Sequence, residues 1–332
     1  MTVETNPTPV LSPERLSWAL ERAEGLRAEI RKALVGQEDV VDQVLTCLLA
    51  GGHVLLEGVP GLGKTLLVRA LAKAFQGTNA RIQFTPDLMP SDVMGHAIYD
   101  PKTGTFNIRQ GPVFTHLLLA DEINRAPAKT QSALLEVMQE QQVTIEGRPF
   151  MVPRPFMVLA TQNPIEQEGT YPLPEAQLDR FLLKVTMAYP TEAEEQRMAR
   201  LVTEGQVGEG LNVDALLAVA DPEGIQELQQ IAAAVKVDEQ VLHYAVRIVR
   251  ASRNSMGIAL GAGPRGVIAL VRAARARAIL DGRDFITPDD VKALALPALR
   301  HRITPSPESE IEGHTCDDLL SSLLDRVEAP RA

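Results

Sequence analysis

Cysteine is nearly absent from this sequence, which argues against disulfide-rich and zinc-binding classes of protein. The 332 residues include only Cys47 and Cys316, far apart in the chain and without the close spacing of paired metal ligands. We therefore expect neither a disulfide framework nor a zinc site, and we expect a location in the reducing cytoplasm. The six histidines are scattered as well, so no histidine-based metal site is predicted.

Long apolar runs and an excess of basic residues are also missing. The most apolar stretch, 44–59, is interrupted by glycine, histidine and glutamate, and it falls short of the ~20 apolar residues of a membrane-spanning helix. Residues 1–16 have no basic stretch before an apolar run, so we predict no signal peptide and no membrane insertion. The formal charge of -10 argues against nucleic acid as the main partner.

The sequence does contain the pattern of an α/β protein. Hydrophobic residues make up 45% of it and charged residues 23%, which is typical of a protein with a packed core. Short apolar or β-branched runs are separated by segments long enough for crossover helices, so we predict a mostly parallel sheet. The predicted strands are 53–57, 81–85, 116–120 and 156–161.

Two stretches, 96–111 and 143–152, break this alternation around a central turn, and we predict a β-hairpin insert at each. From residue 191 onward helical spacing dominates, which predicts a second, all-helical lid domain. The apolar patch at 319–324 is either a docking helix or the last turn of the lid. The predicted divisions are an N-terminal helix and linker at 1–35, the α/β domain at 36–190, the lid at 191–304 and an acidic tail at 305–332.

Residues 58–65, GVPGLGKT, match the phosphate-binding pattern GxxxxGK[ST] between a predicted strand and a predicted helix. Glycines allow backbone N–H groups to approach phosphates, and the helix N-terminus adds its positive dipole end. Lys64 would reach the β and γ phosphates, and the Thr65 hydroxyl would bind magnesium. We therefore predict ATP and Mg²⁺ as ligands. The loop residues assigned to nucleotide binding are Gly58, Pro60, Gly61, Leu62, Gly63, Lys64, Thr65 and Leu66.

Two carboxylates, Asp121 and Glu122, follow the apolar strand 117–120. Acidic residues at such a position often cap a helix or lie in a solvated turn, but the phosphate loop upstream favours a catalytic site. Asp121 would then hold Mg²⁺, and Glu122 would polarise the attacking water. Asn163 follows the next strand, where its amide could contact the γ-phosphate, although a turn asparagine before proline is the alternative.

These motifs resemble the MoxR family of AAA+ ATPases, in the helix-2-insert clade. VGQ at 35–37, the phosphate loop, DEINRA at 121–126, ATQNP at 160–164 and EAQLDRF at 175–181 occur in the MoxR order, and the match covers most of 30–302. The resemblance adds Gly36 and Gln37 to the nucleotide site. It implies that Arg180 is an arginine finger for the next subunit and that Arg265 is sensor 2 from the lid. Asn163 corresponds to sensor 1.

The alternatives for these arginines are structural. Arg180 could form a surface salt bridge with Asp179 or Glu175, and Arg265 could be an ordinary arginine at a helix N-terminus. Arg125 could also face a neighbouring subunit.

By resemblance, the protein is a homo-oligomer, most simply a ring of six, with nucleotide between the two domains and between subunits. It would use ATP to remodel a protein client, as a chaperone in enzyme-complex maturation, with a von Willebrand A-domain partner. The alternatives are the ATPase subunit of a magnesium-chelatase-like complex, a McrB-like nucleic-acid motor and a slowly hydrolysing nucleotide-switched scaffold.

Overall fold

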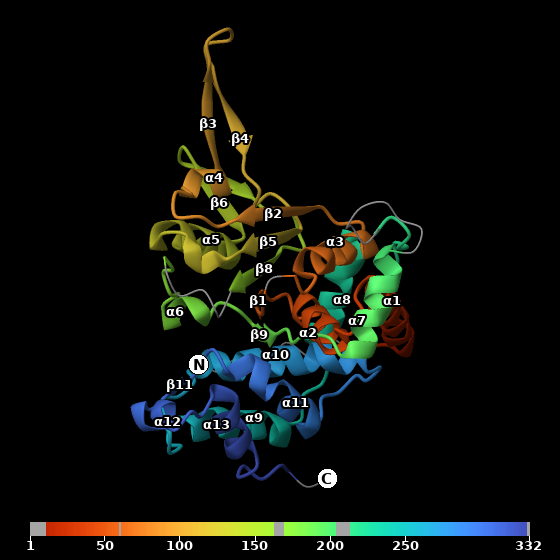
Figure 1. Cartoon of the computed structure of the whole chain (residues 1–332). Helices are drawn as coiled ribbons and strands as arrows, with labels where there is room; N and C mark the ends of the chain where they lie inside the picture. The colour runs from red at the N-terminus through yellow and green to blue at the C-terminus, as the bar shows by residue number, and fades with distance from the viewer. Residues whose placement is uncertain (1–10, 60, 163–168, 204–212, 331–332) are drawn as a thin grey trace, which may run out of the picture.

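A parallel five-stranded sheet lies at the centre of the molecule (Figure 1). The computed structural model describes residues 11–59, 61–162, 169–203 and 213–330. The strand order is β2-β5-β8-β1-β9, which confirms the predicted α/β class. Four of these strands match predicted runs, whereas β9 was not predicted. The strands are β1 (Val54–Glu57), β2 (Asn79–Gln83), β5 (Leu117–Asp121), β8 (Met157–Gln162) and β9 (Leu183–Thr186).

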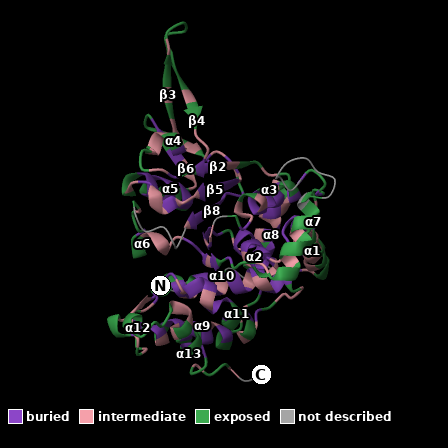
Figure 2. Cartoon of the chain, in the orientation of Figure 1, coloured by how far each residue is buried: buried purple, intermediate pink, exposed green. Residues whose placement is uncertain are grey.

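Side chains of the inner strands alternate between two hydrophobic clusters, one on each face of the sheet. Leu117 and Leu119 belong to the larger cluster, whereas Leu118 and Ala120 belong to the smaller one. This alternation follows from the period of two in a strand. Because both faces are covered, the strand sequences are continuously apolar. Figure 2 shows this buried layer across the sheet and its neighbouring helices.

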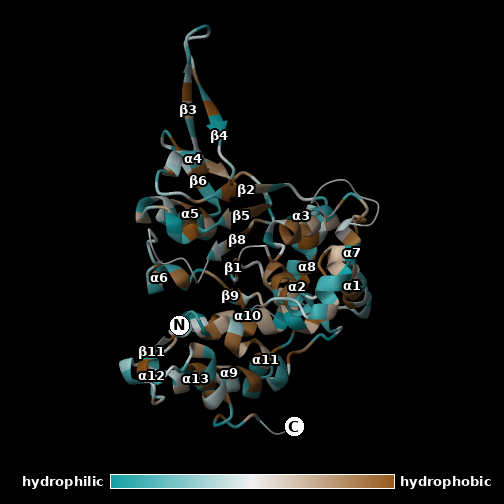
Figure 3. Ribbon diagram, in the orientation of Figure 1, coloured by the Kyte–Doolittle hydropathy of each residue, from teal (hydrophilic) through white to brown (hydrophobic). Residues whose placement is uncertain are grey.

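The larger cluster joins the two ends of the chain into one core. It includes residues of α1 (Pro13–Ala33), α2 (Glu38–Leu49) and α3 (Lys64–Ala74) together with residues of α8 (Pro222–Ala234) and α10 (Pro264–Leu280). Figure 3 shows the hydrophobic residues gathered on α2 and α3. Helix α1 begins at Ser12, whose hydroxyl accepts from Arg15 N at 3.3 Å. The helix predicted within 1–35 is therefore present as α1 and packs in the core, while the domain boundaries remain a prediction.

The smaller cluster is covered by α5 (Ala128–Glu140) and by the hairpin of β6 (Gln142–Ile145) and β7 (Arg148–Met151). The short elements α4 (Pro90–Met94), η1 (Ile123–Arg125) and α6 (Glu175–Leu178) complete this half of the molecule.

The second hairpin, β3 (Gly95–Asp100) with β4 (Thr105–Gln110), projects away from the body (Figure 1). Both predicted hairpins are thus confirmed. At the base of β3–β4 the two backbones nearly touch, since a Cβ on Gly95 would lie 2.2 Å from the Arg109 carbonyl oxygen. Toward its far end, Tyr99 and Phe106 pack their rings with centroids 5.3 Å apart, and Phe106 is 69% exposed.

The lid contains α7 (Glu192–Thr203), α8, α9 (Glu239–Ser252), α10, α11 (Pro288–Leu299), α12 (Pro307–Ile311) and α13 (Cys316–Leu324). A two-stranded ladder of β10 (Ile258–Leu260) and β11 (Thr304–Pro305) is a small departure from the predicted all-helical lid. The predicted acidic tail after residue 305 includes helix α13, in which Leu320, Leu323 and Leu324 are buried. The patch at 319–324 therefore packs in the core beside α9 and α11.

Within the described ranges, no helix is both long and apolar enough to cross a membrane.

Candidate active site

The phosphate loop connects β1 to α3 at the carboxyl edge of the sheet. Gly61 and Gly63 have φ values of 88° and 84°, in the left-handed region that favours glycine. Apart from the immediate chain neighbours, no described residue has an atom within 4 Å of a Cβ built on either glycine, so there is space beside the loop backbone for a phosphate. Lys64 is the first residue of α3, and its Nζ donates to the Gly58 carbonyl at 2.6 Å. Pro60 lies outside the described residues.

Lys64 lies close to the acidic residues of the site. Partial burial lowers the pKa of its ammonium group, and the negative charges of Asp121, Glu122 and Glu57 act in the opposite direction. The Thr65 side chain is exposed next to it. Lys64 and Thr65 therefore combine a cation and an exposed hydroxyl at the N-terminus of a helix, which fits the triphosphate and magnesium predicted there.

Asp121 and Glu122 are held together by a residue from the neighbouring strand, Thr161. The Thr161 hydroxyl donates to Asp121 Oδ1 at 2.6 Å and accepts from Glu122 N at 2.8 Å. Glu122 has φ 55°, a left-handed conformation that costs about 1–2 kcal/mol for a residue with a Cβ. The hydroxyl of one buried threonine thus binds the carboxylate of Asp121 and the backbone of Glu122.

Strand β2 also reaches these carboxylates. Arg81 donates to Asp121 Oδ2 from Nη2 at 2.7 Å and from Nε at 3.2 Å. Gln83 Nε2 donates to Glu122 Oε2 at 2.8 Å. Arg125, for which contact with a neighbouring subunit was one hypothesis, donates to the same Glu122 oxygen at 3.0 Å. A metal on Asp121 and a water beside Glu122 would have to share or replace these contacts.

A cavity of about 870 Å³ lies beside the carboxylates, and its volume is in the range of small-molecule and cofactor sites. Its apolar lining residues include Leu34, Val35, Leu66, Tyr189, Met198 and Ala199. The predicted residues that line the cavity are Gln37, Gly61, Leu62, Gly63, Lys64, Thr65, Leu66, Asp121 and Glu122.

Gln37 is buried and donates from Nε2 to the Ala188 carbonyl at 2.9 Å. Gly36, with φ 73°, lies between the lining residues Val35 and Gln37. Gly58 does not line the cavity, but its carbonyl holds Lys64. Asn163 lies outside the described residues.

Arg180 and Arg265 are not in this cavity. They line a second one, of about 370 Å³, which shares no lining residue with the first. Arg180 Nη1 donates to the Leu135 carbonyl of α5. Arg265 Nη1 lies 3.7 Å from Asp179 Oδ2. Arg265, which is predicted to be sensor 2, thus does not line the cavity of the phosphate loop in its own chain, and the lid helix whose residues line that cavity is α7.

Sequence reasoning missed four residues of the site: Arg81, Gln83, Thr161 and Tyr189. Arg81 and Gln83 are polar positions two residues apart on one strand, which was a usable signal for a shared face. Thr161 lies in the ATQNP motif at 160–164, but no role was predicted for it or for Tyr189, since these roles depend on which segments the fold places beside them.

The fold and the site define a P-loop ATPase of the AAA type. A family model for the ATPase family associated with various cellular activities (AAA) matches residues 53–183, and an AAA lid domain matches residues 250–323. The chain belongs to the MoxR family of AAA+ ATPases, and it is an ATP hydrolase of the chaperone-like kind.

The similarity to individual relatives extends over nearly the full chain. Chaperone MoxR1 of Mycobacterium tuberculosis is 44% identical, over 93% of this chain and 85% of its own length. The uncharacterized protein YeaC of Bacillus subtilis is 46% identical, over 91% of this chain and 92% of its own. The crystal structure of a candidate ATPase from Cytophaga hutchinsonii superposes with a TM-score of 0.88 at 40% identity, covering 96% of this chain and 98% of that one.

Proposed function

We propose that this protein forms a homo-oligomeric ring, most simply a hexamer, in which each ATP is bound by one subunit and contacted by arginines of the next. The proposal rests on one observation, which is that the predicted site residues line two separate cavities of the same chain. Lys64 and the carboxylates line one cavity, and Arg180 and Arg265 line another. A second copy of the chain would complete the site.

In the proposed site the phosphate loop and Lys64 hold the triphosphate, while Thr65 and Asp121 hold Mg²⁺. The ion would neutralise phosphate charge and orient the γ-phosphate when bound. Glu122 acts as the base that polarises water, and Asn163 acts as sensor 1. The contacts with Gln83 and Arg125 both go to Oε2 of Glu122, so the attacking water either binds Oε1 or replaces one of these contacts.

The work done with ATP is proposed to be the remodelling of a protein client in the cytoplasm. The similarity to a chaperone supports this part of the proposal. The projecting β3–β4 hairpin, with Tyr99 and Phe106 exposed, offers a surface for contact with such a client. Maturation of an enzyme complex with a von Willebrand A-domain partner is the finer form of this proposal, and isolation of the complex with a tagged Glu122→Gln variant tests it.

The decisive experiment on the site mixes two inactive variants. Arg180→Ala should bind ATP but hydrolyse it on the order of 10³-fold more slowly, as expected for an arginine finger. Lys64→Ala should fail to bind ATP but still supply Arg180 to its neighbour. Mixed rings should therefore regain part of the wild-type rate. If mixed rings form but remain inactive, Arg180 does not act across a subunit boundary.

A further inference from the structure

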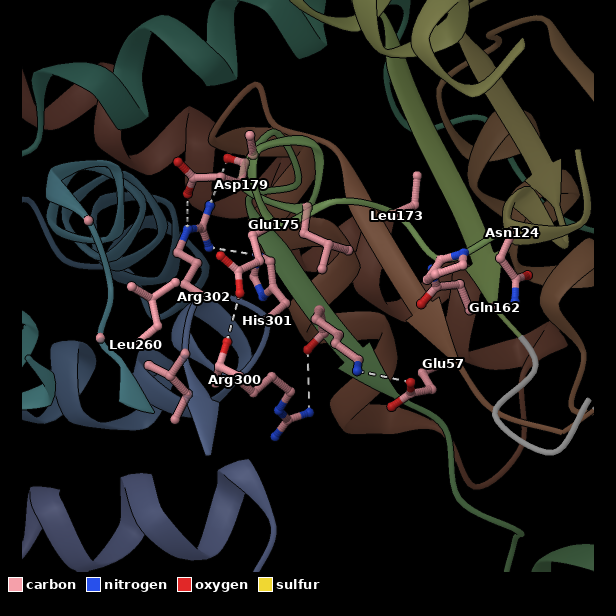
Figure 4. A pocket seen from close by; sticks show the side chains of 18 of the residues that line it. Glu57, Asn124, Gln162, Leu173, Glu175, Asp179, Leu260, Arg300, His301 and Arg302 are labelled. Atoms are coloured by element: carbon pink, nitrogen blue, oxygen red, sulfur yellow. Dashed lines mark hydrogen bonds and ion pairs between the residues drawn. The ribbon is translucent and has the colours of Figure 1, made fainter. Parts of the chain in front are cut away.

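Arg302 is a buried cation between the lid and the segment that carries Arg180. It follows α11, and only 4% of its side chain is exposed. Its Nε donates to Asp179 Oδ1 at 2.7 Å. Figure 4 shows Arg302 and Asp179 facing one another across this contact.

The other nitrogens of Arg302 bind backbone on both sides of Arg180. Nη2 donates to the carbonyl of Asp179 at 3.2 Å and to that of Phe181 at 2.7 Å. Nη1 donates to the carbonyl of Leu182 at 3.2 Å and to that of Ala298 in α11. One guanidinium group therefore joins the end of a lid helix to the residues before and after Arg180.

The bonds of the Arg302 guanidinium group to residues 179–182 hold the two segments in a fixed relative position. Burial lowers the pKa of Arg302, and the hydrogen bond and charge of Asp179 oppose that shift. The planar fork of an arginine loses little freedom for each bond it forms, and a lysine could not reproduce the set. Asp179 Oδ2 also lies 3.7 Å from Arg265 Nη1, so one carboxylate contacts both Arg302 and Arg265, two of the arginines that line the second cavity.

We propose that Arg302 is a positioning residue that fixes Arg180 relative to the lid, so that a movement of the lid moves the finger. This inference rests on the proposed role of Arg180. A group that stabilises a transition state must be held in place, and a displacement of about 1 Å can reduce a rate by ~10²-fold. Loss of the Arg302 contacts should therefore slow hydrolysis in the neighbouring subunit without weakening the binding of ATP.

The test compares Arg302→Lys and Asp179→Asn with a matched control. Asp179 is one-quarter exposed, and asparagine keeps its shape, so this variant should fold even if Arg302→Lys does not. The control is Arg283→Lys, which alters a second arginine–carboxylate pair at the other end of α11, with Asp290 at 2.6 Å. Arg283 makes no contact with 179–182 among the described residues.

We expect Arg302→Lys and Asp179→Asn to lower kcat of assembled rings by about 10- to 100-fold, with the KM for ATP and ring formation unchanged. Arg283→Lys should lower Tm and leave kcat as in wild type. Adding Lys64→Ala subunits, which have an intact Arg302 and Arg180, should restore hydrolysis at the phosphate loops of the Asp179→Asn subunits.

A double variant separates action through Arg180 from general damage. If Asp179 and Arg302 act through Arg180, then Arg180→Ala/Asp179→Asn should be no slower than Arg180→Ala alone. The inference is overturned if the double variant is slower than Arg180→Ala by the same factor that Asp179→Asn alone shows. It is also overturned if Arg180→Ala is slow while Arg302→Lys and Asp179→Asn both hydrolyse ATP at the wild-type rate. Wild-type turnover of Arg180→Ala itself is a different result, because it overturns the finger proposal and the positioning role together.

Discussion

Replacing Thr161 by valine removes one hydroxyl and keeps the shape of a buried side chain that is 1% exposed. The hydroxyl donates to Asp121 Oδ1 at 2.6 Å and accepts from Glu122 N at 2.8 Å. In the valine variant Asp121 keeps its contact with Arg81, but the Glu122 N–H loses its partner. We expect both stability and catalysis to fall.

The size of the stability loss follows from these two bonds. A hydrogen bond to a charged group contributes about 1.5–3 kcal/mol, and a buried donor left without a partner costs about 1–3 kcal/mol. The valine methyl offsets part of this, which gives a loss of about 2–4 kcal/mol. With about 2.1 cal/mol/K of unfolding entropy per residue over 332 residues, Tm should fall by about 3–6 °C.

Thermal melts and ATP turnover of Thr161→Val should be measured beside Thr161→Ser. Serine keeps the hydroxyl and loses only a methyl group, so it should turn over near the wild-type rate. Valine should turn over at least about 10-fold more slowly, because Asp121 and Glu122 lose their shared support. Equal Tm and equal turnover for the two variants would refute the role given to this hydroxyl.

Two other predictions concern the catalytic carboxylate and the lid. Glu122→Gln should bind ATP with unchanged affinity in calorimetry and hydrolyse it about 10²- to 10⁴-fold more slowly, because an amide cannot act as a base; a wild-type rate would remove Glu122 from the mechanism. Leu320→Ala should lower the free energy of unfolding by about 2–5 kcal/mol, since Leu320 is fully buried. An unchanged denaturation midpoint would mean that the packing of α13 does not contribute to the stability of the core.

The parts of the fold that could be predicted are those whose sequence pattern lies within one short, continuous segment of the chain. The phosphate loop is one run of eight residues, so its strand–loop–helix context was visible in the sequence. Strand β9 was missed because its four residues include Lys184 and follow directly on a motif. Its pairing with β1, in which Leu55 lies opposite Lys184, joins positions far apart in the chain.

The same holds for the site, in which the residues of continuous motifs could be predicted and those that depend on long-range contacts could not. Lys64 and Glu122 belong to recognisable patterns, and both line the cavity. Thr161, by contrast, reaches Asp121 only because β5 and β8 are neighbours in the strand order. The position of Arg265 depends on how α10 packs against the rest of the molecule, which helical spacing cannot indicate.

The β3–β4 hairpin is fixed at its base by the close approach of Gly95 to the Arg109 carbonyl, while its far end extends into solvent (Figure 1). Substitutions at exposed positions that form few contacts usually change stability by less than about 0.5 kcal/mol. Residues such as Tyr99 and Phe106 can therefore vary without loss of the core. Related chains could acquire new binding partners by changing this hairpin alone and keep the same ATP-hydrolysing body.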